Sequence, residues 1–333
     1  MSEVLLQLAL FASKSIIVLI VVIAILVTFF ALLAKAKHKV TGLLTIKNLN
    51  KEFAENNEMM MEETLPKKAF KKYCKETKAA DKKREENAEQ TKNIYVLNFN
   101  GDIKASAVDS LSKEITAVLN AAKAKDEVVV KLESPGGVVH GYGLGAAQLM
   151  RIRERKIPLT IAIDKVAASG GYLMACTANK ILAAPFSIIG SIGVIIQLPN
   201  FNKVLKEKNV DFEMHTAGDY KRTITMFGEN TDEGREKLQE EIEKIHQQFK
   251  DLIKEHRPQI NLAETATGEH WLAQQALPLQ LVDEIKTSDE YLLSQSHSAN
   301  IYEVSFEEKK PLLARLTSTA KLLKDKLATL GLS

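Results

Sequence analysis

The segment EVVVKLESPGG, residues 127–137, combines the two features that decide the fold of this chain. Its first half is a short β-branched apolar run of the length of a buried strand. Its second half, SPGG, is a turn sequence whose glycines let the backbone come close to a ligand. We therefore expect a strand followed directly by a turn that points backbone N–H groups into a cavity.

Apolar runs of the same kind recur along residues 93–290, separated by segments with helical periodicity. The expected strands cover 94–99, 127–132, 159–164, 180–185 and 211–216. Between them, apolar residues spaced by three and four positions predict packing helices at about 108–122 and 231–257. Pro258 follows the second helix and should end it. The alternation predicts an α/β domain of βαβ units with a largely parallel sheet.

One stretch of this domain, residues 181–199, is apolar enough to be mistaken for a membrane span. Pro185, Gly190 and Gly193 divide it into pieces of strand length, and it lies within the alternating pattern. We therefore expect buried strands and turns in this stretch.

A different apolar segment precedes the domain. Residues 15–34 contain no charged side chain, and twenty helical residues span a hydrocarbon core of about 30 Å. Because the apolar part of a signal peptide is shorter, we expect one transmembrane helix after a tail at 1–14. Lysines follow this span at Lys35, Lys37 and Lys39, which by the positive-inside rule favours a cytoplasmic location for the rest of the chain.

Residues 35–92 form a charged arm between the expected span and the domain. From Lys47 to Lys92 there are 12 basic and 10 acidic residues in 46 positions, with no glycine and a single proline, Pro66. This composition favours solvated helix, with Pro66 in a first helical turn. The alternative is a contact with lipid or an adaptor through one cluster of lysines: Lys67, Lys68, Lys71, Lys72 and Lys75.

Residues 291–333 form a C-terminal extension after the domain. Leucines near its end predict an amphipathic helix, and they are Leu312, Leu313, Leu316, Leu322, Leu323 and Leu327. Such a helix could pack on its own domain, on a neighbouring subunit or on lipid.

The composition narrows the class of protein. The chain has 333 residues, of which 45% are hydrophobic and 26% charged, so neither a disordered chain nor a multi-span membrane protein fits. A net charge of +3 is too small to suggest a dedicated nucleic-acid binder. Cys74 and Cys176 are the two cysteines, which supply neither a disulfide framework nor the paired ligands of a zinc site.

Two further glycine elements, AASGG at 167–171 and GSIG at 190–193, stand beside expected strands. Ser169 would begin a helix of small residues, where free N–H groups favour a developing negative charge. With the SPGG turn, these elements form a candidate acyl-transfer site. Ser169 would attack a carbonyl, and the N–H groups of Gly137 and Gly170 could receive the oxyanion.

A serine nucleophile needs a base, and the histidines supply no obvious one. Only His140 and His215 are plausible, because the others border the membrane segment or lie in the C-terminal helices: His38, His246, His256, His270 and His297. A lysine is the alternative, and an apolar site must then lower the lysine pKa from about 10.4 so that the amine is neutral. Lys221 follows an expected strand and a glycine turn, although beside Arg222 it is more simply a solvated pair.

The motifs SPGG, AASGGYLMA, GSIGV and GDYKRTITMFGENTDEGR, in this order, resemble the SppA and SohB family of membrane-anchored serine peptidases. The resemblance covers about residues 94–285, and the N-terminal anchor with its charged arm resembles the SohB branch. It implies a fold of the Clp-protease and crotonase type, and a peptidase that needs neither metal nor cofactor.

The resemblance also assigns the site residues. It implies that Ser169 is the nucleophile and Lys221 the general base of a Ser-Lys dyad. Ser191 corresponds to the hydroxyl that orients the lysine amine, and Gly137 and Gly170 correspond to the oxyanion hole. Relatives that use a histidine place it soon after the serine helix, and this chain has none there, which favours lysine.

Assembly, location and substrate are further implications of the resemblance. It implies a ring-like homo-oligomer in which serine and lysine meet across a subunit boundary. It places the catalytic domain outside the cytoplasm, on a bacterial inner membrane, against the indication of the lysine count. Short, unfolded or hydrophobic peptides, such as signal-peptide remnants, are the expected substrates. The chain departs from many relatives at Gln280, where GLVD is replaced by QLVD, which should alter a turn and leave the dyad unchanged.

Two other functions fit the same residues. The first is a catalytically inactive scaffold that binds peptides or a membrane partner through the same groove. The second is a crotonase-like enzyme that acts on acyl-CoA, for which acidic groups in the pocket would be needed.

Overall fold

The computed structural model describes residues 11, 14–28, 42–86 and 91–308. The chain forms two units, residues 1–43 with 307–333 and residues 44–306, and most described residues belong to the second. Residues 14–28 are helical, while the rest of the predicted span 15–34 lies outside the described part. Across the described residues, no helix combines the length and the apolarity needed to cross a bilayer. The predicted C-terminal helix and most of the tail at 1–14 also lie outside them.

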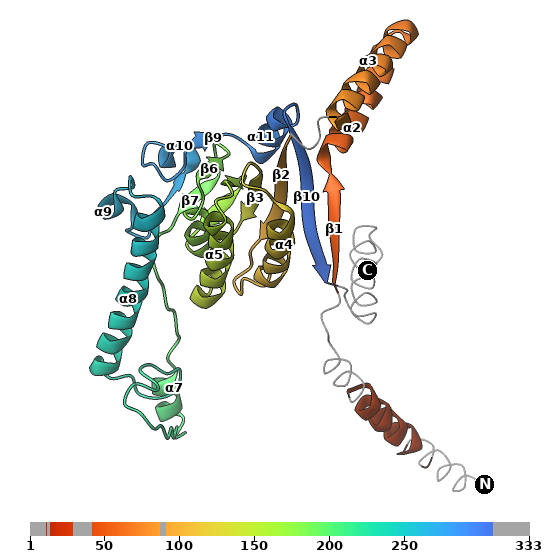
Figure 1. Cartoon of the computed structure of the whole chain (residues 1–333). Coiled ribbons are helices and arrows are strands. Elements are labelled where there is room, and N and C mark those ends of the chain that lie inside the picture. The colour runs from red at the N-terminus through yellow and green to blue at the C-terminus, as the bar shows by residue number, and fades with distance from the viewer. Residues whose placement is uncertain (1–10, 12–13, 29–41, 87–90, 309–333) are drawn as a thin grey trace, which may run out of the picture. The chain divides into compact units, whose positions relative to one another are not determined.

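A seven-stranded sheet is the centre of the larger unit (Figure 1). Its strands are β1 (Gly42–Asn48), β2 (Lys92–Asn100), β3 (Glu127–Glu133), β4 (Leu159–Ile163), β6 (Lys180–Ala183), β9 (Glu284–Ile285) and β10 (Ala299–Glu308). Their order is β1-β10-β2-β3-β4-β6-β9, and from β10 to β9 every neighbouring pair is parallel. The predicted α/β fold with a largely parallel sheet is therefore confirmed.

Apolar residues at matching register join the strands into one core. Leu97 on β2 lies opposite Val130 on β3, and Val130 lies opposite Ile161 on β4. All three side chains are fully buried. Burying such a side chain contributes roughly 1.5–3 kcal/mol, so this row stabilises the centre of the sheet.

Helices cover both faces of this sheet. On one face lie α4 (Val108–Ala121), α5 (Val139–Glu154) and α6 (Gly170–Ala175), whose buried residues share a cluster with Leu97 and Val130. On the other face lie α2 (Leu49–Thr64) and α11 (Ser288–Gln295), which contribute Leu49 and Tyr291 to a second cluster. The spacing of apolar residues in α4 predicted its buried face correctly.

A second, smaller sheet contains β5 (Val166–Ala168), β7 (Ile188–Gly190) and β8 (His270–Leu272). β5 and β7 are parallel, and β8 is antiparallel to β7. The remaining helices are α3 (Lys67–Glu86), α7 (Asn202–Glu207), α8 (Asp232–His256), α9 (Leu262–Thr265) and α10 (Ala273–Ala276). α8 begins after the Thr231 cap and ends before Pro258, as predicted.

The strand predicted at 211–216 is wrong. This segment has no regular structure and its residues are exposed, and none of the strands among the described residues pairs with it. The prediction for 181–199 holds only for its first half. β6 and β7 are there, but Ile195 is 75% exposed and Ile196 is 50% exposed.

Within the charged arm, α2 and α3 are helical as predicted, with Pro66 directly before α3. β1, which lies in the same arm and forms one edge of the sheet, was not predicted. The Asn50 side chain holds the start of α2 against the end of the domain. It donates to the carbonyl oxygens of Ser296 at 3.0 Å and Ala299 at 3.1 Å, and accepts from the N–H of Ile301 at 2.6 Å.

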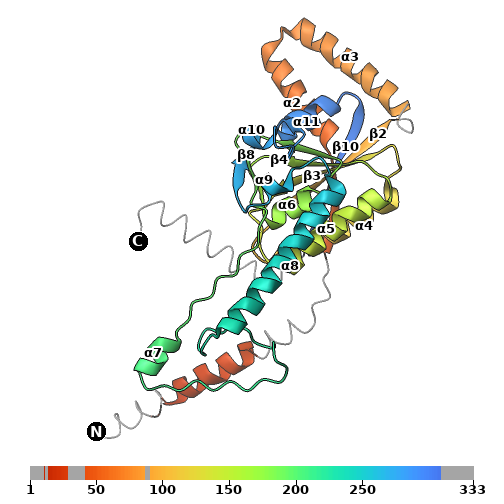
Figure 2. The ribbon, with the colours of Figure 1, turned by 90° about the vertical axis from the view of Figure 1, so that its left-hand side faces the viewer.

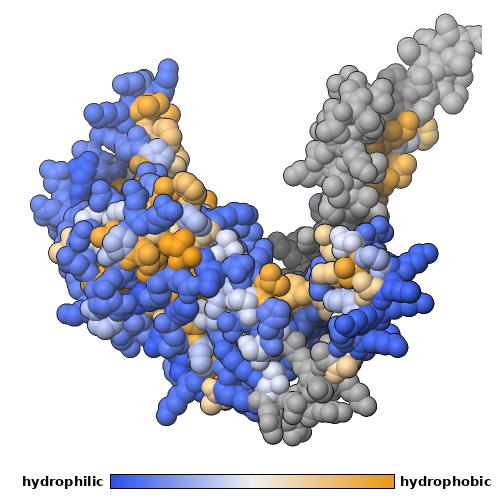
Figure 3. All heavy atoms as spheres, turned by 90° about the horizontal axis from the view of Figure 1, so that it is seen from above, coloured by the Kyte–Doolittle hydropathy of each residue, from blue (hydrophilic) through white to orange (hydrophobic). Residues whose placement is uncertain are grey.

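The sheet extends beyond residues 93–290 because β10 lies within the predicted C-terminal extension. β10 pairs with β2 along Ala299–Glu303, so this part of the extension belongs to the core of the fold. Polar residues cover most of the face that Figure 3 shows, with apolar residues in small groups.

Gln280 keeps the turn conformation that glycine favours. Its φ is +60°, its side chain is exposed, and its carbonyl oxygen accepts a hydrogen bond from the Arg257 guanidinium at 2.9 Å. A left-handed residue with a Cβ costs about 1–2 kcal/mol. We therefore expect Gln280→Gly to raise the free energy of unfolding by about 1 kcal/mol, measured by urea denaturation. Gln280→Ala keeps the Cβ and is the control; an equal gain from alanine would contradict this explanation.

Candidate active site

Ser169 lies at the turn between β5 and α6, in a strained backbone conformation. Its φ is +51° and its ψ is −118°, a region that residues with a side chain rarely adopt and that costs of order 1–3 kcal/mol. The Ser169 N–H donates to the Gly190 carbonyl at 2.8 Å, which fixes the turn to the end of β7. A serine on a sharp turn from strand to helix is displayed in the way that nucleophiles require.

The SPGG turn packs directly against Ser169. Ser134 forms an isolated parallel bridge with Ala167, and its carbonyl oxygen accepts from the Ala168 N–H at 3.0 Å. Next to it, Gly136 has a φ of +91°, and a Cβ there would lie 2.8 Å from the Ser169 Cβ. Only glycine allows this close approach.

Gly170, a predicted oxyanion donor, directly follows Ser169. It is the first residue of α6, so its N–H has no partner within the helix. A Cβ on Gly136 would lie 2.8 Å from the nitrogen of Gly170, so the SPGG turn lies against the start of α6. Gly137, the other predicted donor, is the next residue of this turn, and it is exposed.

Ser191 lies beside Ser169 on the neighbouring strand. β5 and β7 are in parallel register with Ala168 opposite Gly190, so each serine is the first residue after a paired position. Ser191 also has a φ of +51°, and its N–H donates to the Glu269 carbonyl at 2.6 Å. The fold therefore places Ser191 beside Ser169.

Lys221 is not brought to Ser169 within one chain. It lies in residues 194–231, which we call the protruding arm, and its side chain is exposed. Figures 1 and 2 show this segment, with α7, at the end of α8 that is remote from α6.

Contacts along α8 show how far Lys221 is displaced. The neighbouring Tyr220 ring lies 4.9 Å from the Lys237 Nζ, near the start of α8, whereas the buried Phe249 lies near its end. α8 packs against α6 in the folded body. Twelve helical residues separate Lys237 from Phe249, which corresponds to roughly 18 Å along the helix axis. The arm therefore holds Lys221 well away from the part of α8 that joins the body.

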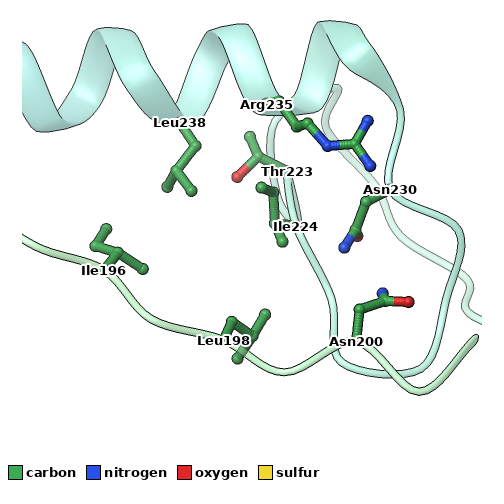
Figure 4. Close-up of a pocket in the computed structure, with 8 residues that line it drawn as sticks. All are labelled: Ile196, Leu198, Asn200, Thr223, Ile224, Asn230, Arg235 and Leu238. Carbon is green, nitrogen blue, oxygen red and sulfur yellow. The ribbon is translucent and has the colours of Figure 1, made fainter.

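The arm has a defined shape because it packs on α8. An open cavity of about 390 Å³ lies between residues 196–200, residues 223–230 and the first turns of α8 (Figure 4). Ile196 and Ile224 face Leu238 across it. Asn200 further joins the two chains, since its side-chain amide donates to the carbonyl oxygens of Thr225 at 2.9 Å and Gly228 at 3.0 Å.

None of the histidines within the described residues forms a hydrogen bond with Ser169. His140 is exposed on the first turn of α5, and His215 is exposed on the arm, 3.7 Å from Glu213. His270 lies on β8 opposite Gly190, close to the site in register. The sequence did not predict this position, because a strand of three residues leaves no periodic signal.

The buried Cys176, at the C-terminal end of α6, is a second potential nucleophile in this region. Burial raises the pKa of the Cys176 thiol to about 12, so it is not a thiolate at neutral pH. Among the residues that the structure describes, no group of three or more His, Cys, Asp or Glu side chains could hold a metal ion. The reactive group that the geometry displays is the Ser169 hydroxyl.

Two buried hydroxyl groups, those of Ser134 and Tyr142, lie beneath the turn and were not predicted from the sequence. The Ser134 Oγ lies 2.5 Å from the Tyr142 OH, and it accepts from the Gly136 N–H at 3.0 Å. Ser134 belongs to the SPGG motif, but its side chain was given no role there, and Tyr142 was not singled out because a tyrosine on an apolar helix face is ordinary core.

Comparison with known proteins gives matches along most of the chain. The model of "Peptidase family S49 N-terminal" matches residues 3–149, and that of "Peptidase family S49" matches residues 151–301. The chain is 42% identical to the "Probable protease SohB" of Haemophilus influenzae, over 96% of this chain and 94% of that protein. It is 50% identical to the "Probable protease SohB" of Buchnera aphidicola subsp. Acyrthosiphon pisum, over 68% of each.

Among solved structures, a mutant of the 1510-N membrane-bound stomatin-specific protease matches 62% of this chain and 84% of its own. The identity is 16% and the TM-score 0.36, a value too low to establish a shared fold.

Proposed function

Since the chain belongs to peptidase family S49, we propose that it is a serine endopeptidase with Ser169 as its nucleophile and Lys221 as its general base. The membership confirms the resemblance seen in the motifs. The observation that carries the assignment of Ser169 is its position: a strained serine at the start of α6, with Gly136 of the SPGG turn packed against it.

The reaction follows from this arrangement. Neutral Lys221 accepts the proton of the Ser169 hydroxyl while Oγ attacks the peptide carbonyl. The N–H groups of Gly137 and Gly170 stabilise the oxyanion, and protonated Lys221 then donates to the leaving amine. In the second half of the reaction, neutral Lys221 accepts a proton from water, water attacks the acyl-enzyme, and the proton returns to the Ser169 oxygen as the acid product leaves. Ser191, next to Ser169 in register, accepts or donates a hydrogen bond that orients the lysine amine.

In our proposal, Lys221 reaches Ser169 from a neighbouring copy of the chain. The Lys221 side chain is exposed in the single chain, and the surface of a neighbouring copy would supply the apolar surroundings that a lysine base requires. The protruding arm carries exposed apolar residues, namely Ile195, Ile196, Val204, Val210, Phe212, Met214, Tyr220 and Phe227. Apolar surface of this extent on one segment is typical of an interface, and a ring of copies would bury it.

Three finer features belong to the same proposal. The two-sheet arrangement with parallel βαβ units supports a fold of the Clp-protease and crotonase type. The apolar segment at 15–34 supports a membrane anchor, with the catalytic domain outside the cytoplasm of a bacterial cell. Short, unfolded or hydrophobic peptides, such as signal-peptide remnants, are the proposed substrates.

A serine-directed fluorophosphonate tests the proposed nucleophile. We expect the full-length protein in detergent to be labelled at Ser169, located by peptide mass spectrometry, and Ser169→Ala to remove the label. Ser294→Ala is the matched control, because Ser294 lies on α11, on the opposite face of the sheet, and its loss leaves the site intact. A scaffold without catalytic function would show no label at Ser169, and labelling at Ser191 alone would reassign the nucleophile.

A further inference from the structure

A chain of hydrogen bonds runs beneath the oxyanion turn. It begins at the Gly136 N–H, which donates to the Ser134 Oγ at 3.0 Å. The Ser134 Oγ lies 2.5 Å from the Tyr142 OH, and the Tyr142 OH donates to the Asp102 carbonyl oxygen at 2.8 Å. Ser134 and Tyr142 are both fully buried, so water does not compete for these bonds.

The donor and the acceptor of every hydrogen bond in this series can be assigned. A carbonyl oxygen can only accept, so the Tyr142 proton goes to Asp102. The Ser134 hydroxyl must then donate to the Tyr142 oxygen, which leaves a Ser134 lone pair for the Gly136 N–H. Each hydroxyl proton therefore has a single acceptor. Hydrogen bonds that all point the same way in a buried site polarise and strengthen one another.

The Tyr142 ring also supports the other side of the oxyanion hole. A Cβ on Gly170 would collide with the Tyr142 ring, so the backbone of Gly170 rests against that ring. A Cβ on Gly101 would collide with the Tyr142 OH and lie 2.7 Å from the Ser134 Oγ, so the network leaves no free space. One tyrosine thus contacts both backbone segments that carry the two oxyanion donors.

We propose that Tyr142 and Ser134 are positioning residues of the peptidase, which hold the N–H groups of Gly137 and Gly170 at the spacing that the oxyanion requires. The inference rests on the proposed function of Ser169. Oxyanion donors act only when they are preorganised, and a small displacement of a catalytic group lowers the rate of the chemical step more than substrate binding. A tyrosine that merely fills the core would affect stability alone.

Kinetics of Tyr142→Phe and Ser134→Ala in the full-length protein test this inference. We expect kcat for a fluorogenic peptide to fall by roughly 10- to 100-fold in each variant, with KM within about threefold of the wild type. Affinity for a peptide aldehyde, whose adduct with serine carries the oxyanion, should fall in parallel with kcat. Tyr291→Phe is the matched control, because it also removes a buried tyrosine hydroxyl, bonded to Glu127 at 2.8 Å, on the opposite face of the sheet.

The double variant shows whether the two hydroxyls act as one unit. If they do, Tyr142→Phe combined with Ser134→Ala should lower kcat no more than about twice as far as the worse single variant. Retention of kcat within threefold in both single variants would overturn the inference, as would an equal loss in Tyr291→Phe. A wild type with no activity beyond that of Ser169→Ala would instead refute the proposed function, and the inference with it.

Discussion

Ser169→Ala and Lys221→Ala should each lower the rate of peptide cleavage by about 10⁴-fold or more, because the loss of either member of a catalytic dyad disables the whole dyad. Removing the hydroxyl leaves no nucleophile, and removing the amine leaves no group to accept the serine proton. Turnover of a fluorogenic peptide by purified full-length variants is the measurement. Thermal unfolding should change little for Lys221→Ala, since this side chain is exposed in the single chain.

Lys203→Ala is the matched control for the lysine. Lys203 is an exposed lysine on α7 in the same protruding arm, so its loss removes one charge from this segment without touching the dyad. We expect full turnover in this variant. Activity that survives in Lys221→Ala would rule out the dyad and direct attention to the exposed His215 of the same arm.

Mixing the two inactive variants should restore activity if the dyad forms between copies. In a ring of head-to-tail interfaces, each site takes Ser169 from one copy and Lys221 from the next. When Ser169→Ala and Lys221→Ala chains assemble at random in equal amounts, about a quarter of the sites combine an intact serine with an intact lysine. We therefore expect about a quarter of the wild-type turnover after co-expression of the two chains.

The control for this mixing experiment is a chain that carries both substitutions. Ser169→Ala co-expressed with this double variant contains no intact serine and should remain inactive. If the two single variants also remain inactive together, although pull-down shows that they assemble, the dyad does not form across copies. The exposed position of Lys221 would then leave the chain without a base for Ser169.

Much of the fold was predictable because its signals are local. Four of the five predicted strands are present, since a buried parallel strand needs an unbroken apolar run and the sequence shows one. The fifth, at 211–216, has the same local pattern but pairs with none of the strands that the structure describes, and strand formation depends on a partner. β1 and β8 were not predicted because their own residues show no strand pattern. They are strands because each pairs with a neighbouring strand in the folded protein.

The residues of the site were predictable to different degrees. Ser169, Gly137 and Gly170 follow strands as glycine-rich turns, and such turns have a signature in the chain itself. The hydrogen-bond chain from Gly136 to Asp102 has none, because Ser134 and Tyr142 become neighbours only when α5 packs on β3. Lys221 matched a family motif, but its exposure on an arm was visible only in the folded chain.

Residue order along this chain was sufficient to specify the parallel α/β core and the turn that carries Ser169, because apolar periodicity and glycine turns act over a few neighbouring residues. Folding alone established that Ser134, Tyr142 and Asp102 meet beneath that turn, and that Lys221 lies away from it on the protruding arm, near the start of α8. Such contacts join segments that are distant in sequence, and the packing of whole elements determines them.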